Sequence, residues 1–322
     1  MDLRQLRYFV AIFESGTLSN AADNLRIAAS ALSHHLANLE SELGVKLFYR
    51  KPRGMAPTAA GHRLHEHAKL ILKTLAAAEA DLREAGGEIS GDVSIGMAYS
   101  AVKAIGVDLA RRVLQDFPRL ELALTESLSG TTLMNLLASD VDIALVYNPP
   151  LDPSLRTQPI LEERMVLVGK REIIGEDKGP ITFEELLKLP IILLRQGVSA
   201  RAILDDINLL KKIEKSAKLQ MNSIQAIAGS LEAGLGCVIG TKLFMQDQLA
   251  KGTVHFRPIV EPELSRTLYM CELTSRPPTF ALEAVRNLAL ELIEEAVNDG
   301  RWEAKLVLKK RRNLRQPDRR GT

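Results

Sequence analysis

Residues 3–25, LRQLRYFVAIFESGTLSNAADNL, decide the fold of the N-terminal region. Apolar residues recur in the first half of this stretch at helical spacing, which predicts an amphipathic helix that ends before Gly16. Thr17 is a suitable N-cap for a second, short helix over residues 18–25, where two adjacent alanines permit close packing. The stretch therefore predicts two helices joined by a tight turn.

A third helix is expected after the turn at residues 26–28, and Gly44 closes it. Its apolar face consists of Leu32, Leu36, Leu39 and Leu43. Helix, short turn and helix form the helix-turn-helix arrangement, in which the later helix enters the major groove of DNA by its N-terminal residues. A plain three-helix bundle with a charged loop fits the same pattern.

Polar side chains on the third helix and a basic turn after it are candidate contacts to DNA. Small hydroxyl and imidazole side chains on the exposed helix face can approach base edges and phosphates. Residues 45–57 predict a two-stranded wing whose basic turn lies near phosphates. The candidate DNA contacts are Thr17, Ser30, Ser33, His34, Arg50, Lys51 and Arg53.

The first 61 residues resemble the DNA-binding domain of the LysR-type transcriptional regulators. The pieces that match are residues 3–25 together with ALSHHLANLESELGVKLFYR (31–50) and PTAAGHRL (57–64). Within that family, RGMAPTAAG (53–61) is similar to the regulators of nitrogen assimilation. The resemblance implies a winged helix-turn-helix domain over residues 1–58 that binds a specific sequence in double-stranded DNA.

One position departs from the family pattern. The family usually has Gln-Pro where this chain has Ala29-Ser30. Ala29 cannot hydrogen-bond a base edge, and losing such a contact removes roughly 1–3 kcal/mol of discrimination at one base pair. We expect an altered or relaxed operator, with Ser33 and His34 carrying more of the readout.

A long helix with one apolar stripe is expected from Thr58 to about Glu84, within a linker over residues 59–89. The stripe has heptad spacing, so its apolar side chains share one helix face, and we expect this face to pack against another element. Its expected contact residues are Leu64, Ala68, Ile71, Leu75 and Leu82. Packing against the following domain fits the pattern equally well. The family resemblance implies pairing with a second copy, and two recognition helices related by a two-fold axis would read an inverted repeat.

Strand-like and helical runs alternate over residues 90–300, which favours an α/β domain with a parallel sheet. Such sheets bind ligands beyond the carboxyl ends of their strands, where helix N-termini offer free N–H groups. Hydroxyl and amide side chains gather at these expected junctions, and ordinary helix capping would also account for each. They are Ser100, Ser129, Thr131, Ser199, Asn222 and Ser223.

The same region resembles the LysR effector domain, which has two subdomains similar to periplasmic solute-binding proteins. The matching segments are GDVSIGMAYS (91–100), LSGTTLMNLLASDVDIALVYNPP (128–150), ERMVLVG (163–169) and AIAGSLEAGLGCVIG (226–240). The resemblance implies subdomain I at 90–161 and 267–299, and subdomain II at 162–266. The small-molecule contacts that it implies are Ser100, Ser129, Thr131, Tyr147, Asn148, Val198 and Ser199. The fold expected for the whole chain is thus α/β, with an N-terminal winged helix-turn-helix, a long linker helix and a two-subdomain, periplasmic-binding-protein-like effector domain.

The sequence does not identify the effector. Lys103, Arg195 and Arg201 are the only basic residues expected near the cleft, which is sparse for a dicarboxylate. Alternatives are a regulator controlled by its own abundance without an effector, and a solute-binding or catalytic α/β protein whose N-terminal domain is an interaction module. RNA polymerase is a further candidate partner.

Charge divides the chain unevenly. Residues 1–73 carry a net charge of +4 and residues 301–322 carry +7, so the middle of the chain is acidic. A basic N-terminal region suggests a polyanion partner. Residues 301–322 form a basic tail that we expect to be disordered, whether it attaches to DNA or is simply solvated.

Other chemistry finds little support in the sequence. No P-loop, G-x-S-x-G or H-E-x-x-H motif occurs, so we expect no enzyme, no cofactor and no metal. His62, His65 and His67 lie close together and are expected to be polar positions of the linker helix. Cys237 and Cys271 fit a reducing compartment. With no secretory pattern and no apolar run of membrane-spanning length, we expect a cytoplasmic protein and no membrane partner.

Overall fold

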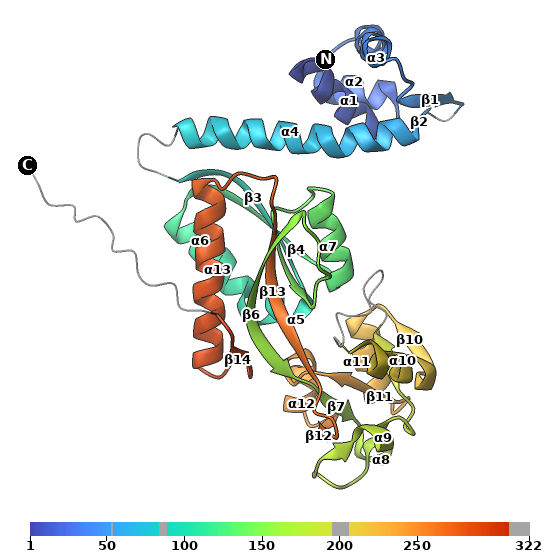
Figure 1. The fold of residues 1–322 in the computed structure, drawn as a ribbon, viewed down its shortest axis with the longest axis vertical. Coiled ribbons are helices and arrows are strands. Elements are labelled where there is room, and N and C mark those ends of the chain that lie inside the picture. Colours follow the sequence, from blue (N-terminus) through green and yellow to red (C-terminus); the bar gives the residue numbers. More distant parts are fainter. Residues whose placement is uncertain (53, 84–88, 195–205, 309–322) are drawn as a thin grey trace, which may run out of the picture.

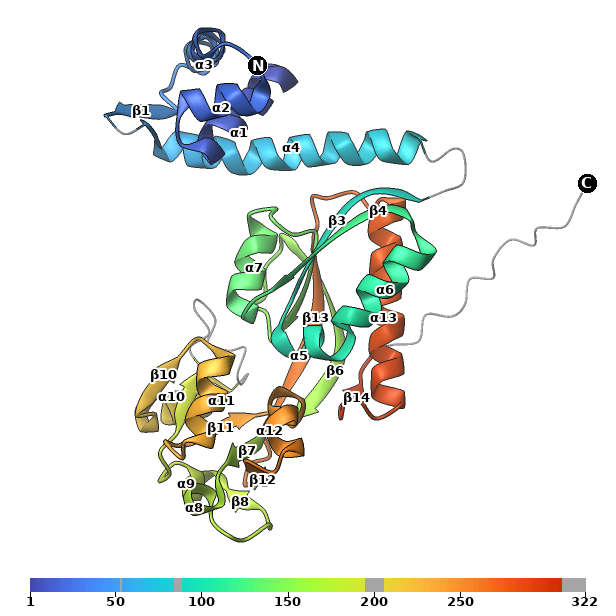
Figure 2. The ribbon, with the colours of Figure 1, turned by 180° about the vertical axis from the view of Figure 1, so that it is seen from behind.

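The computed structural model describes residues 1–52, 54–83, 89–194 and 206–308. A small helical domain lies at one end, a single long helix runs beneath it, and a two-lobed α/β domain follows (Figures 1 and 2). None of the described helices is long and apolar enough to cross a membrane.

The N-terminal domain is a three-helix unit with a two-stranded wing. Its elements are α1 (Leu3–Ser15), α2 (Leu18–Leu25), α3 (Ala29–Leu43), β1 (Phe48–Lys51) and β2 (Gly54–Pro57). Asp2 and Gln5 form a capping box at the start of α1, and Thr17 caps α2 by accepting from the Asn20 amide at 3.1 Å. Phe9 and Phe48 are among the buried side chains that join the helices to the wing.

The wing is held close to the turn that precedes α2. The Met55 amide donates to the Gly16 carbonyl at 2.7 Å. Gly54 has a φ of 130°, and a side chain there would collide with the same carbonyl oxygen. This position therefore requires glycine, and the close approach sets the direction of the wing relative to the helices.

The linker helix α4 (Ala59–Arg83) begins at Thr58, whose hydroxyl accepts from the Gly61 amide at 3.0 Å. The stripe expected to pair with a second copy is divided between two environments. Leu64 and Ala68 pack into the core of the N-terminal domain of the same chain. Ile71 and Leu82 are exposed, at 40% and 80%, and belong to no core cluster of the described residues.

Subdomain I is built on a six-stranded sheet in the order β14-β6-β13-β5-β3-β4. The strands are β3 (Ser90–Met97), β4 (Arg119–Glu126), β5 (Ile143–Tyr147), β6 (Leu155–Arg164), β13 (Ser265–Leu273) and β14 (Lys305–Leu306). Its helices are α5 (Tyr99–Ala101), continued by a π-helical turn (Val102–Gly106), α6 (Val107–Asp116), α7 (Ser129–Leu137) and α13 (Phe280–Asn298). Helices α6 and α13 cover one face and α7 the other (Figures 1 and 2).

The parallel sheet that the alternation predicted is only half right. Strands β3, β4 and β5 are parallel, whereas β13 runs antiparallel to both β5 and β6. The reason is that β6 leaves for subdomain II and β13 brings the chain back. Strand β5 alternates between the two cores, with Ile143 and Leu145 facing α13 and Ala144 and Val146 facing α7.

Subdomain II has a four-stranded sheet in the order β11-β7-β12-β8 and a parallel pair β9-β10. The strands are β7 (Val166–Gly169), β8 (Ile181–Thr182), β9 (Ile192–Leu194), β10 (Leu219–Met221), β11 (Cys237–Gly240) and β12 (His255–Val260). The helices are α8 (Arg171–Ile174), α9 (Phe183–Leu186), α10 (Ile207–Ser216), α11 (Ile224–Glu232), a 3-10 turn (Leu243–Met245) and α12 (Gln246–Ala250). The chain enters it after Arg164 and leaves it before Ser265.

The disordered tail expected from residue 301 is wrong for its first part. Trp302 is fully buried, and β14 pairs with β6 through Lys305 opposite Glu162 and Leu306 opposite Leu161. A single indole anchors this segment to the core around α13, which a search for apolar periodicity does not detect. Residues 309–322 lie outside the described residues.

Candidate DNA interface and effector cleft

The recognition helix α3 starts without a side-chain cap. Ala28 occupies the N-cap position and makes no capping hydrogen bond, and Ala29 and Ser30 are exposed beside it. The first backbone N–H groups of a helix have no partner within the helix, so they remain available to phosphate oxygens here. His34 is exposed one turn later, with its Nε2 3.2 Å from the side-chain nitrogen Nδ2 of Asn38.

The wing and the recognition helix share one surface. Arg50 Nη2 in β1 donates to Ser33 Oγ in α3 at 3.0 Å, so two of the expected DNA contacts touch each other. Lys51 is exposed at the end of the same strand. Thr17 is engaged as the cap of α2, which leaves its hydroxyl less free than the sequence suggested. Arg53 lies outside the described residues.

A buried carboxylate that the sequence analysis missed fixes the wing to the recognition helix. Glu40 of α3 accepts from the Leu47 and Phe48 amides at 2.8 and 3.3 Å, and from Lys46 Nζ at 2.7 Å. Burial acts to raise the pKa of Glu40, but these three donors outweigh it and lower the pKa. The ionised carboxylate therefore holds the turn from which β1 emerges.

The cleft between the subdomains brings Ser100 and Ser129 together at its inner end. Both are nearly fully buried, and Ser129 Oγ accepts from the Tyr147 amide at 3.1 Å. Ser100 Oγ accepts from Arg266 Nη2 at 3.1 Å. The cavity beside them measures only about 20 Å³, and Tyr147 and Arg266 also line it.

Other expected cleft residues have different surroundings. Asn148, at a φ of 42°, accepts from the Thr267 amide at 2.9 Å and so connects the end of β5 to β13. Thr131 is exposed on α7 and lines neither cleft cavity. Val198, Ser199, Arg195 and Arg201 lie outside the described residues.

The two subdomains touch across the mouth of the cleft. Lys103 donates to Asp247 at 2.7 Å, so the one described basic residue expected to meet a ligand is already paired. The rings of Tyr99 and Phe244 meet edge to face with 5.8 Å between their centroids. An outer cavity of about 540 Å³ remains, with a polar lining that includes Glu126, Asn222, Ser223, Gln225 and Gln248 and, among the described residues, no basic side chain. Ser223 also caps α11, as the capping alternative predicted.

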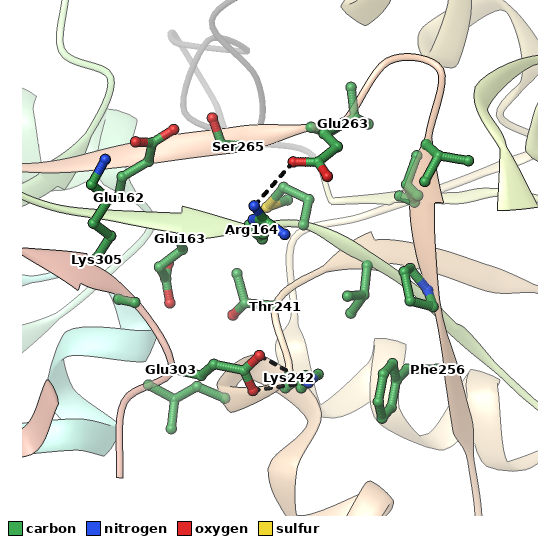
Figure 3. Close-up of a pocket in the computed structure, with 18 residues that line it drawn as sticks. Glu162, Glu163, Arg164, Thr241, Lys242, Phe256, Glu263, Ser265, Glu303 and Lys305 are labelled. Carbon is green, nitrogen blue, oxygen red and sulfur yellow. Dashed lines mark hydrogen bonds and ion pairs between the residues drawn. The ribbon is translucent and has the colours of Figure 1, made fainter. Parts of the chain in front are cut away.

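A larger cavity of about 770 Å³ lies at the crossing of the two strands that connect the subdomains (Figure 3). It shares no lining residue with the cleft cavities. Four of its charged residues form two pairs: Arg164 lies 3.4 Å from Glu263, and Lys242 lies 2.9 Å from Glu303. Figure 3 shows both pairs joined at the cavity wall, with Glu162, Glu163 and Lys305 as further charged residues of the lining.

The two cysteines are inaccessible in this arrangement. Cys237 and Cys271 are buried, and burial raises the pKa of each thiol to about 12. Neither thiol forms an appreciable amount of thiolate at neutral pH. Within the described ranges, no group of three His, Cys, Asp or Glu side chains is placed to hold a metal ion.

Comparison with known families agrees with this architecture. Residues 3–62 match the model of the bacterial regulatory helix-turn-helix proteins of the lysR family, and residues 86–294 match the LysR substrate binding domain. The chain belongs to the LysR family. It is a LysR-type transcriptional regulator with an N-terminal helix-turn-helix domain and an effector-binding domain, as the sequence predicted.

Relatives of this LysR-type regulator support its subgroup and its fold. The nitrogen assimilation regulatory protein nac of Klebsiella aerogenes is 30% identical over 303 residues, which are 94% of this chain and 98% of that protein. The resemblance to nitrogen assimilation regulators is thereby confirmed.

Solved structures of the family show the same fold. A variant of full-length OxyR from Pseudomonas aeruginosa has a TM-score of 0.70 at 20% identity, covering 91% of this chain and 95% of that one. Full-length CbnR in complex with its target DNA has a TM-score of 0.62 at 21% identity, covering 92% of this chain and 100% of that one.

Proposed function

We propose that this regulator binds an inverted-repeat operator in double-stranded DNA as a homodimer or a dimer of dimers. The observation that carries the proposal is the surface shared by α3 and the wing, where Arg50 contacts Ser33. Ser30, His34 and Lys51 are exposed on the same two elements. CbnR, whose fold is similar, has been solved with its target DNA.

Footprinting of the full-length protein on DNA upstream of its own gene tests this proposal. A protected inverted repeat at low micromolar protein is the expected result. The Arg50→Met variant should lose one phosphate contact and lower the salt slope of binding by about 1. Arg164→Met, which removes an exposed arginine of the effector domain, is the control and should leave the slope unchanged. Absence of a protected site in the parent protein would contradict the proposal.

The free part of the linker stripe supports pairing with a second copy. Leu64 and Ala68 already pack against the N-terminal domain of the same chain and are not free to pair. We therefore assign the interface to Ile71, Leu75 and Leu82. Ile71 and Leu82 are exposed apolar side chains on one long helix, and burying them against the same helix of another chain would stabilise the dimer. Ile71→Glu should shift the protein toward monomer in light-scattering measurements, whereas Glu66→Gln on the exposed side of the helix should not.

The effector domain is the second half of the proposal. A small molecule would occupy the outer cleft cavity. Its described lining offers amide and hydroxyl groups and the carboxylate of Glu126 but no basic side chain, which favours an uncharged polar ligand over a dicarboxylate. A metabolite screen by thermal shift on the full-length protein tests this. Stabilisation by polar, uncharged metabolites is the expected result, and preferential stabilisation by dicarboxylates would contradict it.

A regulator that works without an effector is the second candidate. The observation in its favour is the closed inner end of the cleft, which leaves only about 20 Å³. In either case we propose no catalytic role, in keeping with relatives that are transcriptional regulators, and RNA polymerase remains a candidate partner.

A further inference from the structure

The guanidinium group of Arg266 occupies the inner end of the cleft. Arg266 starts from the crossing strand β13 and is only 7% exposed. Its Nη2 donates to Ser100 Oγ at 3.1 Å, and its Cζ lies 3.7 Å from the centroid of the Tyr147 ring. Stacking of a cation on an aromatic face in a desolvated site is a favourable contact. Arg266 thus contacts two of the residues that were expected to meet a small molecule.

Glu163 holds this guanidinium from the other crossing strand. The two residues are register partners in the β6–β13 ladder, and Arg266 Nε donates to Glu163 Oε2 at 3.0 Å. Glu163 is 1% exposed, so the ion pair is shielded from water and salt. The pair joins the two strands at the point where the chain passes from one subdomain to the other.

Trp302 fixes the orientation of the Glu163 carboxylate. Its Nε1 donates to Glu163 Oε1 at 2.6 Å, while the other carboxylate oxygen receives Arg266. With a donor on each oxygen, the carboxylate has one preferred orientation, and the guanidinium is aimed by it. The contacts therefore run without a break from Trp302 through Glu163 and Arg266 to Ser100.

Little space is left around this chain of contacts. The cavity bounded by Ser100, Ser129, Tyr147 and Arg266 holds about one water molecule at its 20 Å³. Tyr147 Oη is buried there without a well-aligned hydrogen-bond partner among the described residues. A metabolite could reach Ser100 only by displacing Arg266, which would leave the Glu163 carboxylate unpaired.

We propose that Arg266 is a built-in occupant of the effector cleft, and that Glu163 and Trp302 are its positioning residues. In the resting protein the guanidinium takes the place of a ligand at Ser100 and holds the two connecting strands β6 and β13 together. Any effector then acts from the outer cavity or competes with Arg266. This inference rests on the proposed role of the cleft as the effector site.

Chemical rescue with methylguanidinium tests the proposal on the full-length protein. Arg266→Ala should create a cavity with a preformed carboxylate, and its melting temperature should fall. Millimolar methylguanidinium should then raise the melting temperature of Arg266→Ala by about 3 °C or more by binding the folded state. The matched control is Arg164→Ala, whose exposed guanidinium pairs with Glu263 on the same two connecting segments. It should show no such gain, and neither should the parent.

Trp302 supplies a second readout, because it is the only tryptophan of the chain. Acrylamide quenching of its emission should increase in Arg266→Ala and return toward the parent value with methylguanidinium. Equal responses of Arg266→Ala and Arg164→Ala to the probe would overturn the proposal, and so would a melting temperature of Arg266→Ala equal to that of the parent.

Two further variants distinguish whether Glu163 and Trp302 position the guanidinium group or only stabilise the fold. The double variant Glu163→Gln, Arg266→Met removes both buried charges and should fold, yet it should not respond to methylguanidinium because the carboxylate is gone. In Arg266→Ala, adding Trp302→Phe keeps an aromatic ring but removes the donor to Glu163, and should weaken the apparent affinity for methylguanidinium about tenfold. Unchanged affinity would show that Trp302 is not a positioning residue. None of these readouts involves DNA, so their failure is distinct from a failure of the footprint.

Discussion

Lys73 of the linker helix donates to Asp142 at 2.9 Å and joins the DNA-binding half of the chain to its own effector domain. Asp142 is 3% exposed, and its other oxygen accepts from the amide and the hydroxyl of Ser94 at 2.8 Å each. Arg276, from the loop before α13, also donates to Asp142, and Lys69 pairs with the adjacent Asp140. The linker helix is therefore fixed to subdomain I by charges at one end of the sheet.

Loss of the shared carboxylate should cost far more than loss of one lysine. Asp142→Asn leaves Arg276 and Lys73 without their common partner, and breaking such a buried pair typically costs about 3–5 kcal/mol. Lys73→Met leaves the Arg276–Asp142 pair intact and should cost under about 1 kcal/mol. Burial, Arg276 and Lys69 already lower the pKa of Lys73 to about 8, which means that the surroundings disfavour its charged form. Urea unfolding of the two variants measures the difference.

Lys212→Met serves as the control for this series, because Lys212 pairs with Glu184 on an exposed surface. Its midpoint should match that of the parent within error. Equal losses in Asp142→Asn and Lys73→Met would show that the carboxylate is not the centre of the contact.

Stability should fall on acidification because of His65. Its ring stacks on Phe13 of α1 at 3.8 Å between centroids. Burial first, and then the charge of Lys69, lower its pKa below the ordinary 6.5, although Glu14 opposes them. The unfolded chain therefore takes up a proton before the folded one does, so stability is full above about pH 6.5 and declines below it. His65→Phe should flatten this decline in thermal melts between pH 5 and 7.

The exposed His67 provides the comparison for that experiment. His67→Phe should leave the pH dependence unchanged. If His65→Phe and the parent lose stability in parallel on acidification, His65 is not the responsible group.

Ala29→Gln should change the operator preference. Ala29 is exposed at the start of α3, where a glutamine could reach a base edge. Selection of binding sites from a random pool should then show a new preference at one base pair in each half-site, worth roughly 1–3 kcal/mol. Ala37→Gln places the same side chain two turns further along the helix and should select the parent sequence. An unchanged preference in Ala29→Gln would count against a base contact at this position.

Two C-terminal truncations should distinguish the effect of the terminal basic residues on DNA binding from the effect of Trp302 and β14 on stability. Residues 309–322 contain seven of the Lys and Arg side chains, and a protein ending at residue 308 should melt like the parent. Its salt slope for DNA binding should decrease if those charges meet phosphates. A protein ending at residue 300 also loses Trp302 and β14 and should melt several degrees lower. Equal melting of the two truncations would refute the structural role of residues 301–308.

The N-terminal domain was predictable because its signals are local. The helices α1 to α3 follow from apolar spacing, from Thr17 as a cap and from the glycines that end α1 and α3. Ser100 and Ser129 line the inner end of the cleft, because strand ends and helix starts are local features, and their contact with a small molecule stays a prediction. The sequence showed that polar groups gather there, although not what fills the space between them.

The contacts of the cleft were not predictable because they join distant residues. Glu163 and Arg266 are 103 positions apart, and each is an ordinary charged residue in its own segment. Charged residues are usually solvated, so nothing local marks these two as buried. The same holds for Asp142, which directly precedes β5, and for Trp302, which stands in a basic segment without apolar periodicity. The pairing of β6 with β13 and β14 brings Glu163, Arg266 and Trp302 together, whereas Asp142 meets its partners through α4, β3 and the loop before α13.

The place of β14 at the edge of the sheet has a consequence for protein synthesis. The winged domain emerges first from the ribosome and has its own core, and residues 165–264 form subdomain II from one continuous stretch. The sheet of subdomain I is complete only when residues 301–308 have been translated, because β14 covers the edge of β6. Domains generally fold as units in the order of their synthesis. A nascent or prematurely terminated chain would thus carry a finished DNA-binding domain on an effector domain with an open strand edge, which is a template for aggregation.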